Sequence, residues 1–415
     1  MRKIILSFAI ITLFIGCSAD YDESSTEPAN NIVTDKFGGN DYVLKQAEDF
    51  IRSFSYTTRS GMTSTEISTV IPIRQQEVWP EERITRSSAS NLLPDTILYA
   101  VNLGNNNGYL LVSADVRVPG VVAYIEKGSY SQTQTDVSPG EKVFIEGLHD
   151  FFVSELEKSS LFDSFEPVGP VGPYGTWEFD EYVGPLLSTT WGQGSPYNMF
   201  CYTDAGLQAV AGCVAIAIGQ IVAYHQYPSL YSGHTYNWNA ILQNSYVTSS
   251  DSVASESVAH LVHDIGLLVH MSYGTTGSGA TFDNVEYCWN AFNYHYTKMK
   301  SCSFDTLMVN IQSSHPVYMK GRNSNNEGHA WVVDGIAIRT FYYPEMEDGQ
   351  GNIIQLTGDS YNLIHCNWGW DGFHNGFFVY GALQNKYNLQ TDGITSTPTG
   401  YNNSNYIYHH IYPND

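Results

Sequence analysis

The chain has 415 residues, of which 42% are hydrophobic, so it is long enough for two or three domains and a sizeable core. Its formal net charge of −23 argues against nucleic-acid binding, because phosphate contacts need clustered lysine and arginine. From Thr176 onward there are 6 Lys and Arg against 19 Asp and Glu, so the acidity continues into the C-terminal part. The 30 tyrosines and 8 tryptophans are typical of a β-rich, secreted protein.

The first residues predict an export signal. Two basic residues precede an apolar run over residues 4–15, which is shorter than the roughly 20 apolar residues that a transmembrane helix needs. Gly16 and Cys17 follow the run directly, as in a bacterial lipobox, although Phe14 departs from the usual leucine. We expect Cys17 to carry a lipid anchor; the alternative is ordinary signal cleavage that discards it. The protein is therefore expected at the bacterial outer membrane or cell surface, or to be secreted after maturation.

A small α+β unit is predicted after an acidic tether. Apolar residues at three- and four-residue spacing predict a helix over residues 41–54. Strands are expected over residues 97–101, 109–113 and 121–125, and a helix over residues 141–158 closes the unit. No group of residues in this unit indicates catalytic chemistry.

Residues 165–175 predict an exposed linker, because three prolines and three glycines in that stretch exclude the interior of a helix or sheet. Proteolytic nicking concentrates in such linkers. The part that begins near Thr176 is expected to be helical in its first half and strand-rich in its second. The predicted helices cover residues 210–225, 252–269 and 282–292.

Cys213 lies in the opening turn of the first of these helices. Gly212 leaves its backbone uncrowded, and the positive end of the helix dipole favours the thiolate, which is the nucleophilic form. His329 follows Gly328 at the start of a predicted strand. A thiol at a helix start that faces a histidine on a strand is the geometry of a thiolate–imidazolium pair. Taken alone, the two residues could instead be an inert buried thiol and a structural histidine.

Two further segments supply what a hydrolytic Cys–His pair needs. The Gln193 amide can donate to a developing oxyanion beside the Cys213 backbone N–H, or it can be a surface amide in a turn. Asn367, at the end of a predicted strand, can accept from the imidazole and fix its tautomer. Trp368 can cover that contact and keep water away; the alternative is an aromatic corner of the core.

The remaining cysteines have spacings unlike a zinc knuckle, and we expect no metal or cofactor. Disulfides and buried free thiols both stay open for them. They are Cys201, Cys288, Cys302 and Cys366.

Four motifs, in their order along the chain, resemble the streptopain family of papain-like cysteine proteases. They are Trp-Gly-Gln-Gly-Ser-Pro-Tyr-Asn over 191–198, Gly-Cys-Val-Ala-Ile-Ala-Ile-Gly-Gln-Ile from 212, Gly-His-Ala-Trp-Val-Val-Asp-Gly over 328–335 and Asn-Trp-Gly-Trp from 367. Residues 100–115 and 122–130 are similar to the propeptide of that family. The resemblance spans most of residues 40–385.

The resemblance implies an α+β fold with a papain-like two-subdomain catalytic part, one half helical and the other antiparallel β, preceded by a small α+β prodomain. It implies a cysteine endopeptidase that is made as an inactive zymogen, with protein or peptide substrates and its own propeptide as intramolecular inhibitor. The chain would then divide into residues 1–17 as signal peptide with lipobox, residues 18–175 as tether, propeptide and linker, and residues 176–415 as the catalytic domain.

The resemblance also assigns roles at the matching positions. Cys213 would be the nucleophile, His329 the general base and acid, and Gln193 the oxyanion donor. In this family the tryptophan of the Asn-Trp-Gly-Trp turn takes over much of the role of the asparagine in papain. Asn367 and Trp368 are therefore a joint assignment.

The substrate-binding expectations rest on three residues. Gly328 resembles a position that shapes a pocket preferring an apolar residue before the scissile one. Ser278 and Gly279 border the same cleft, or alternatively cap a helix that begins at Phe282. Two other functions stay open: a catalytically inactive papain-like adhesion or binding lipoprotein, and a Cys–His acyltransferase. Membrane contact is expected only through the lipid anchor.

Overall fold

A computed structural model describes most of the chain after residue 39. The described residues are 40–58, 66–79, 93–131, 138–162, 175–322, 327–344, 346–347, 353–354, 357–383 and 406–414. The predicted signal peptide, Cys17 and nearly all of the predicted linker lie outside these ranges. Within them, no helix combines the length and the apolar character needed to cross a membrane.

The N-terminal unit is an antiparallel sheet with a long helix before it and another after it, as predicted. Its first helix buries the apolar face that the spacing predicts, including Val43, Ala47 and Phe50. The elements are α1 (Asn40–Thr58), β1 (Ile67–Arg74), α2 (Gln75–Val78), β2 (Thr96–Leu103), the turn η2 (Gly104–Asn106), β3 (Tyr109–Ser113), β4 (Val121–Ile125) and α4 (Pro139–Phe162).

The helical half follows β5, and two of its helices are shorter than predicted. The first begins at Cys213 rather than residue 210, because Gly212 has a positive φ of 90° that is incompatible with a helix. Another begins at Val285 rather than Phe282. The elements are β5 (Thr176–Val183), α5 (Cys213–His225), β6 (Leu230–Tyr231), β7 (His234–Thr235), α6 (Trp238–Ile241), α7 (Ser252–Leu268) and α8 (Val285–Ala291).

The C-terminal part is rich in strands, as expected. Its elements are β8 (Tyr294–Met299), α9 (Phe304–Gln312), β9 (Val317–Arg322), β10 (Gly328–Tyr342), β11 (Met346–Glu347), β12 (Ile353–Ile354), β13 (Thr357–Asn367), β14 (Gly376–Val379), α10 (Tyr380–Leu383) and β15 (Tyr406–Pro413).

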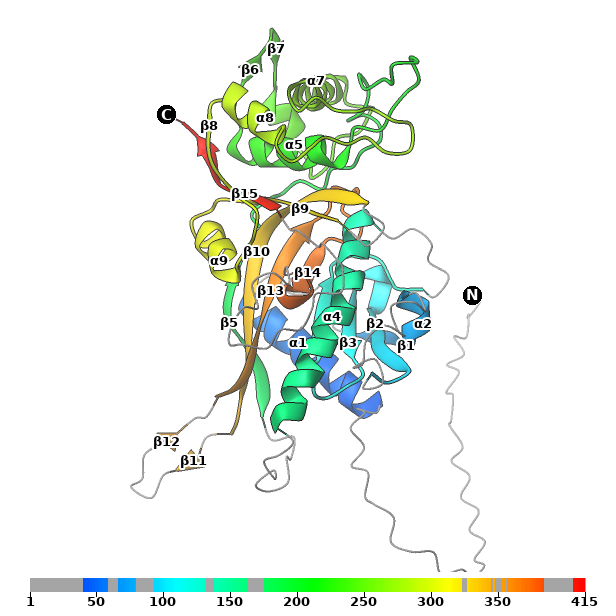
Figure 1. Cartoon of the computed structure of the whole chain (residues 1–415), viewed down its shortest axis with the longest axis vertical. Coiled ribbons are helices and arrows are strands. Elements are labelled where there is room, and N and C mark those ends of the chain that lie inside the picture. The colour runs from blue at the N-terminus through cyan, green and yellow to red at the C-terminus, as the bar shows by residue number, and fades with distance from the viewer. Residues whose placement is uncertain are drawn as a thin grey trace, which may run out of the picture. The chain divides into compact units, whose positions relative to one another are not determined.

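One antiparallel sheet joins the N-terminal unit to the C-terminal part. Its order is β1-β2-β3-β4-β14-β13-β10-β9-β15-β8, and β5 pairs with the second half of β10. The junction lies between β4 and β14, where Ile125 is opposite Gly376. Figure 1 shows α1 and α4 beside this sheet, whereas α5, α7 and α8 gather at one end of it. The predicted propeptide and the predicted catalytic part therefore share a continuous sheet.

Strand β10 separates two hydrophobic cores. Trp331 and Val333 pack into the core that includes the N-terminal unit, whereas Ala330 and Val332 pack against the helical half. This alternation follows from the two-residue period of a strand. The mixture of a helical half, an antiparallel sheet half and a preceding small α+β unit confirms the predicted fold class.

Candidate active site

Cys213 is the first residue of α5, and its side chain is partly exposed. Gly212 precedes it with a positive φ, and a Cβ atom at Gly212 would lie 3.0 Å from the Met271 sulfur. The positive φ therefore favours glycine, and the space around this position is tight. The unpaired N–H groups and the dipole at the helix start favour a negative charge on the sulfur.

The thiol of Cys213 has a lowered pKa. Burial alone would raise it, but the charge of His329 and a hydrogen bond from its ring lower the pKa overall. The Ala330 backbone N–H, which donates to the sulfur, and the charge of Lys320 act in the same direction. A lowered thiol pKa increases the fraction of nucleophilic thiolate.

His329 is the second residue of β10 and is 2% exposed. Its Nε2 lies 2.8 Å from the Trp368 carbonyl oxygen. Because a carbonyl only accepts, this contact requires the proton on Nε2 and leaves Nδ1 for the Cys213 sulfur. The structure thus joins sulfur, imidazole and a backbone carbonyl in one chain of contacts.

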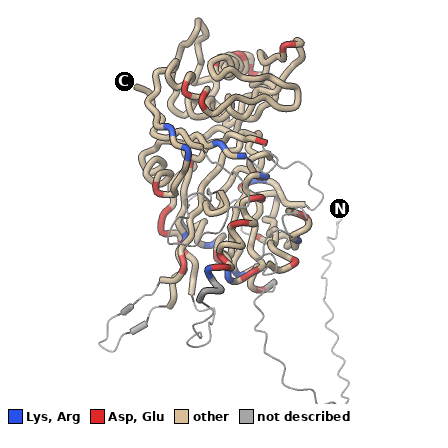
Figure 2. Tube along the Cα trace, viewed as in Figure 1, with Lys and Arg blue, Asp and Glu red and all other residues tan. Residues whose placement is uncertain are grey.

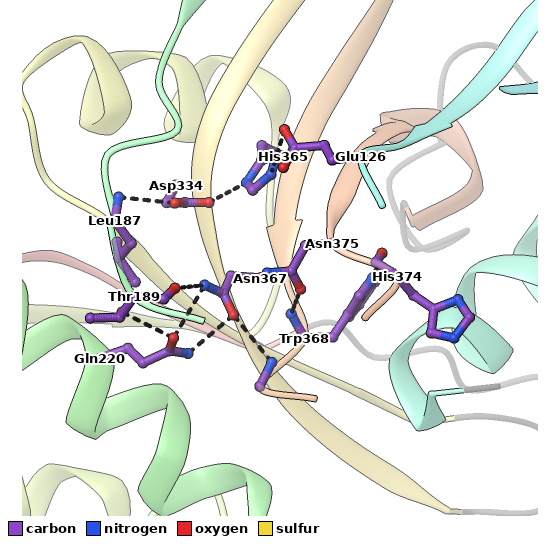
Figure 3. Close-up of polar contacts among 11 residues, drawn as sticks. Glu126, Leu187, Thr189, Gln220, Asp334, His365, Asn367, Trp368, His374 and Asn375 are labelled. Carbon is purple, nitrogen blue, oxygen red and sulfur yellow. Dashed lines mark hydrogen bonds and ion pairs between the residues drawn. The ribbon is translucent and has the colours of Figure 1, made fainter. Parts of the chain in front are cut away.

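Asn367 lies at the end of β13, but its amide does not take the position expected from the sequence. Its Nδ2 donates to the Thr189 carbonyl at 2.7 Å, and it forms a reciprocal amide pair with Gln220 at 3.1 and 3.2 Å (Figure 3). Its Oδ1 also accepts from the Gly369 backbone N–H at 3.2 Å. The oxygen that contacts His329 is the backbone oxygen of the following residue. Asn367 therefore fixes the turn rather than the imidazole directly.

Trp368 is fully buried beside the histidine. Its backbone N–H donates to Asn375 Oδ1 at 3.0 Å, and its Nε1 donates to the His374 carbonyl at 2.8 Å (Figure 3). Its ring centroid lies 6.4 Å from that of His329 and 5.2 Å from that of Trp331. These contacts hold the Trp368 carbonyl toward the imidazole and surround the ring with aromatic side chains.

Gln193 is brought to the start of α5 by its backbone. Its carbonyl accepts from the Ala211 N–H at 2.9 Å, two residues before Cys213. Its side chain is partly exposed. This register places an amide-bearing residue beside the helix start that carries the thiol.

The predicted substrate-binding residues lie on two segments near the thiol. A Cβ atom at Gly212 would lie 3.0 Å from the Ser278 carbonyl oxygen, so the loop with Ser278 adjoins the helix start. The Ser278 hydroxyl donates to the Val210 carbonyl at 2.7 Å, and α8 begins well after it, so it does not cap that helix. Gly279 and Gly328 are both exposed.

A buried carboxylate–imidazole pair lies close to the turn and was not predicted. Asp334 Oδ1 lies 2.5 Å from His365 Nδ1, and the second carboxylate oxygen accepts from the Leu187 N–H at 3.1 Å (Figure 3). Burial alone would lower the pKa of His365, but Asp334 and Glu126 raise it to about 10. The signal in the sequence was Asp334 itself, an acidic residue within the apolar run that follows His329.

The N-terminal unit contacts the same region through two carboxylates. Glu126, next to β4, lies 3.5 Å from His365 Nε2, and Glu141, in α4, lies 2.8 Å from His374 Nδ1. Burial alone would raise the pKa of Glu126, but the His365 charge lowers it overall. These contacts bridge the predicted propeptide and the strands that flank the Trp368 turn.

Gly140 makes a further contact between the N-terminal unit and the Trp368 turn. A Cβ atom at this position would lie 2.1 Å from the Trp368 ring. The start of α4 therefore packs directly on the indole, which no side chain larger than glycine would allow.

The cysteines of the described ranges are all free thiols. Burial raises the pKa of Cys288 and Cys366 well above the ordinary value, in contrast to Cys213. In the same ranges, no three His, Cys, Asp or Glu side chains are grouped as metal ligands would be.

Comparisons with known proteins match two separate stretches of the chain. Residues 191–378 match the model of the Peptidase C10 family, and residues 39–149 match that of the Spi protease inhibitor. Streptopain from Streptococcus pyogenes is 24% identical over 402 residues, which cover 85% of this chain and 91% of streptopain. The thiol protease/hemagglutinin PrtT from Porphyromonas gingivalis is 26% identical over 345 residues, which cover 73% of this chain and 36% of that protein.

A solved structure has the same fold. The prointerpain A fragment from Prevotella intermedia superposes on this chain with a TM-score of 0.53 and 19% sequence identity. The superposition covers 84% of this chain and 99% of the fragment. The resemblance expected from the four motifs is thus confirmed. The chain is thus a cysteine protease zymogen similar to streptopain, in which the match to the Peptidase C10 family is preceded by the match to the Spi protease inhibitor.

Proposed function

We propose that this chain is an endopeptidase whose nucleophile is Cys213 and whose general base and acid is His329. The observation that carries the proposal is the contact chain of sulfur, imidazole and Trp368 carbonyl. A free thiol at a helix start has a lowered pKa here, whereas the buried cysteines elsewhere have raised values. That contrast is typical of one reactive cysteine among inert ones.

The reaction would proceed in two steps. The Cys213 thiolate attacks the scissile carbonyl carbon, and the His329 imidazolium gives its proton to the leaving amine. A water molecule, deprotonated by the same ring, then attacks the thioester and releases the acid and the thiol. The Cys213 N–H and the Gln193 amide would donate to the oxyanion in both steps, and one such donor typically contributes about 3 kcal/mol.

We assign different roles to Asn367 and Trp368, the two residues that the sequence assigns jointly. Trp368 would orient the imidazole through its backbone carbonyl, which is 2.8 Å from Nε2. Asn367 would act through Trp368, because its amide fixes the turn by way of Gln220 and Gly369. Asn367 is then a positioning residue.

The proposed maturation follows the division into residues 1–17, 18–175 and 176–415. Residues 18–175 would be removed after cleavage in the linker over 165–175. Support comes from the described contacts of Glu126, Glu141 and Gly140 with the strands and the ring beside the site. These contacts lie at the Trp368 side rather than over the thiol, so inhibition would act through the turn.

We further propose that the chain is exported and anchored by a lipid on Cys17, at the outer membrane or cell surface, or released after maturation. The basic start, the apolar run over residues 4–15 and Gly16-Cys17 support this. A Cys17→Ser protein that still labelled with a radioactive fatty acid and stayed with the membrane would contradict the anchor.

The substrate is proposed to lie between Gly328 on one side and Ser278 and Gly279 on the other. Both glycines are exposed and leave space for a substrate chain. The residue before the scissile residue is expected to be apolar. Its side chain would lie beside Gly328 and the small Ala330.

One experiment tests the assignment and the maturation together. Wild-type and Cys213→Ala proteins are purified, their N-termini are sequenced, and hydrolysis of a fluorogenic peptide is measured. We expect the wild type to be cut near residue 175 and to hydrolyse the peptide, and the variant to remain uncut and inactive. Full activity in Cys213→Ala would overturn the assignment. Incorporation of an amine without net cleavage would favour an acyltransferase, and an inert wild type with an unreactive thiol would favour a binding lipoprotein.

A further inference from the structure

Gln220 is a fully buried amide on α5, seven residues after Cys213. Seven residues make about two helical turns, so the two residues lie on the same side of the helix, about 10 Å apart along its axis. Of the buried residues that the structure describes on this helix, Gln220 alone has a polar side chain. A buried polar group is costly unless it is hydrogen-bonded, so the partners of Gln220 bear on its role.

Two backbone groups fix the orientation of the Gln220 amide and of its partner. The Trp191 backbone N–H lies 3.1 Å from Oε1, and an N–H only donates, so the oxygen must face it. The Thr189 hydroxyl donates to the same oxygen at 3.0 Å (Figure 3). Nε2 is left for Asn367, whose Oδ1 accepts from it at 3.1 Å. The Thr189 carbonyl orients the Asn367 amide in turn, because it accepts from Nδ2 at 2.7 Å.

The Trp191 contact ties α5 to the segment that carries the proposed oxyanion donor. Gln193 lies two residues after Trp191, and its carbonyl accepts from the Ala211 N–H at 2.9 Å, just before the helix. The Trp191 ring also packs on the helix, since a Cβ atom at Gly219 would lie 3.1 Å from it. The segment is thus held at two points, and Gln220 supplies the polar contact at one of them.

The Asn367 contact ties the same helix to the Trp368 turn. Asn367 directly precedes Trp368, whose carbonyl oxygen lies 2.8 Å from His329 Nε2. Cys213 is the first residue of the helix on which Gln220 lies. One side chain therefore links the helix that carries the thiol to the carbonyl that faces the imidazole.

The three segments contain no carboxylate, lysine or arginine that could take the place of this amide. Residues 187–194, α5 and residues 367–370 have no Lys, Arg, Asp or Glu among them. Figure 2 shows most of the helical half in tan, with few acidic or basic residues. Polar contacts between these segments are therefore hydrogen bonds, which constrain direction as well as distance.

We propose that Gln220 is a positioning residue of the protease: its amide sets the placement of the thiol helix, the oxyanion-donor segment and the Trp368 turn relative to one another. The inference rests on the proposed function. Loss of the amide should displace two groups that act in the chemical step, the oxyanion donor and the imidazole. The hydrogen bonds described for Gln220 do not reach Gly328 or Ser278, beside the proposed substrate position. We therefore expect kcat to fall while KM stays nearly unchanged.

The first test compares Gln220→Met with the mature wild type. Methionine has a similar length and fills the space without replacing the hydrogen bonds. We expect kcat per folded enzyme to fall by about tenfold to a hundredfold, as for a misplacement of about 1 Å, with KM changed by less than about threefold. Asn310→Leu is the matched control. Asn310 is a fully buried amide on α9 that accepts from the His410 backbone N–H on β15 at 2.7 Å, so its loss should weaken the fold without lowering kcat.

Gln220→Glu supplies a rescue that depends on pH. A neutral carboxylic acid offers an acceptor and a donor, as the amide does, whereas a carboxylate has no donor for Asn367 Oδ1. Burial favours the neutral form of a carboxyl group. The ratio of kcat in this variant to kcat in the wild type should therefore be near unity at acid pH and fall toward the Gln220→Met level as the pH rises. A side chain that only fills space would give a low ratio at every pH.

A double-mutant cycle tests the branch to the oxyanion donor. Gln193→Ala should lower kcat by about a hundredfold in the wild type, the usual loss for one such donor. It should lower kcat by clearly less in Gln220→Met, because a displaced donor contributes less to begin with. Equal losses in the two backgrounds would overturn the placement of this segment by Gln220.

Two further results would overturn the inference: a kcat of Gln220→Met within about twofold of the wild type, or an equal fall of kcat in Asn310→Leu. If Gln220→Met does not fold, the pH series with Gln220→Glu decides, since a ratio that stays low at every pH contradicts the role of the donor. Failure of the proposed function would be distinct: the wild type would not hydrolyse the peptide, or Cys213→Ala would hydrolyse it as fast.

Discussion

The Trp368 turn is held from two sides, and the two sides differ in where their contacts come from. On one side Asn367 pairs with Gln220 and Thr189, all in the part of the chain that follows the predicted linker (Figure 3). On the other side Gly140 packs on the Trp368 ring, in the propeptide. In the proposed maturation, the first set would persist after removal of the propeptide, whereas the second would be lost. The turn that would orient the imidazole is therefore also in contact with the propeptide. Removal of the propeptide would change the surroundings of this turn.

The two sides also differ in chemistry. The Asn367 side uses neutral amides and carbonyls, which do not titrate in the physiological range. The propeptide side uses carboxylates against histidines, Glu126 with His365 and Glu141 with His374. Contacts of the second kind depend on pH and salt, and those of the first kind do not. Variants on the two sides of the turn should therefore differ in how their effects depend on pH and salt.

The largest effect is expected for His329→Ala, which removes the group that both sides of the turn position. We expect kcat/KM of the mature enzyme to fall by about a thousandfold, within the usual range for a general acid–base group. The measurement is peptide hydrolysis at saturating and limiting substrate. His270→Ala is the control, because that histidine is exposed and stacks on Tyr287. A loss of less than about tenfold would contradict the assigned role.

Asn367→Ala breaks the side of the turn that persists. It leaves the buried Gln220 amide without its partner, so we expect the unfolding free energy to fall by about 1–3 kcal/mol. The displaced Trp368 carbonyl should lower kcat by about tenfold or more, with little change in KM, because the imidazole loses its orientation. Urea unfolding and steady-state kinetics of the mature enzyme measure both. Asn367→Asp or Ala variants with normal kcat would show that the turn needs no support from this side.

Glu141→Gln breaks the propeptide side and should leave the mature enzyme unchanged. In the uncleaved chain, loss of the contact with His374 should increase the rate of Cys213 alkylation by a few-fold, about the effect of one partly buried charged contact. Glu155→Gln is the matched control, since it lies on the same helix and pairs with Lys158. Equal alkylation rates in the two variants would contradict a role for Glu141 in holding the turn.

The smallest effect concerns pH. The pKa of Glu126 is lowered in the folded chain, so its contact with His365 stabilises the chain above the ordinary carboxyl range and is lost as the pH falls through the lowered value. The pKa of His365 is raised to about 10, so its contribution is present below its ordinary value and is lost as the pH rises through about 10. Both contributions are complete above the ordinary carboxyl range and below the ordinary histidine value.

The pH dependence of the Glu126–His365 contact can be measured in a Cys213→Ala background, which would prevent self-cleavage. The unfolding free energies with Glu126 and with Glu126→Gln should differ most at mildly acid pH, between the ordinary carboxyl and histidine values, and converge as the pH falls through the lowered pKa of Glu126. A difference that stays constant from neutral to acid pH would exclude a charged contact.

The elements of the chain were largely predictable because their signals are local. The spacing of Val43, Ala47 and Phe50 predicts α1, and the apolar run after His329 predicts β10. The start of α5 was predicted too early, because the positive φ of Gly212 is a tertiary requirement set by the loop that carries Met271.

The relations between distant segments could not be predicted in the same way. The pairing of β4 with β14, which joins the propeptide to the protease sheet, leaves no local pattern in either strand. The contact between the His329 ring and a backbone carbonyl also cannot be predicted from the sequence, because every residue has a backbone carbonyl. For that reason the sequence pointed to the Asn367 side chain, an acceptor at the start of the turn.

The most direct test of the account is the pH dependence of alkylation of the mature enzyme, with the modified residue identified by mass spectrometry. We predict that Cys213 in the wild type reacts at pH values well below the ordinary thiol pKa of about 8.5, and that His329→Ala moves its profile upward. A wild-type profile that follows an ordinary thiol, or one that His329→Ala leaves in place, would contradict the sulfur–imidazole pair on which the proposed function depends.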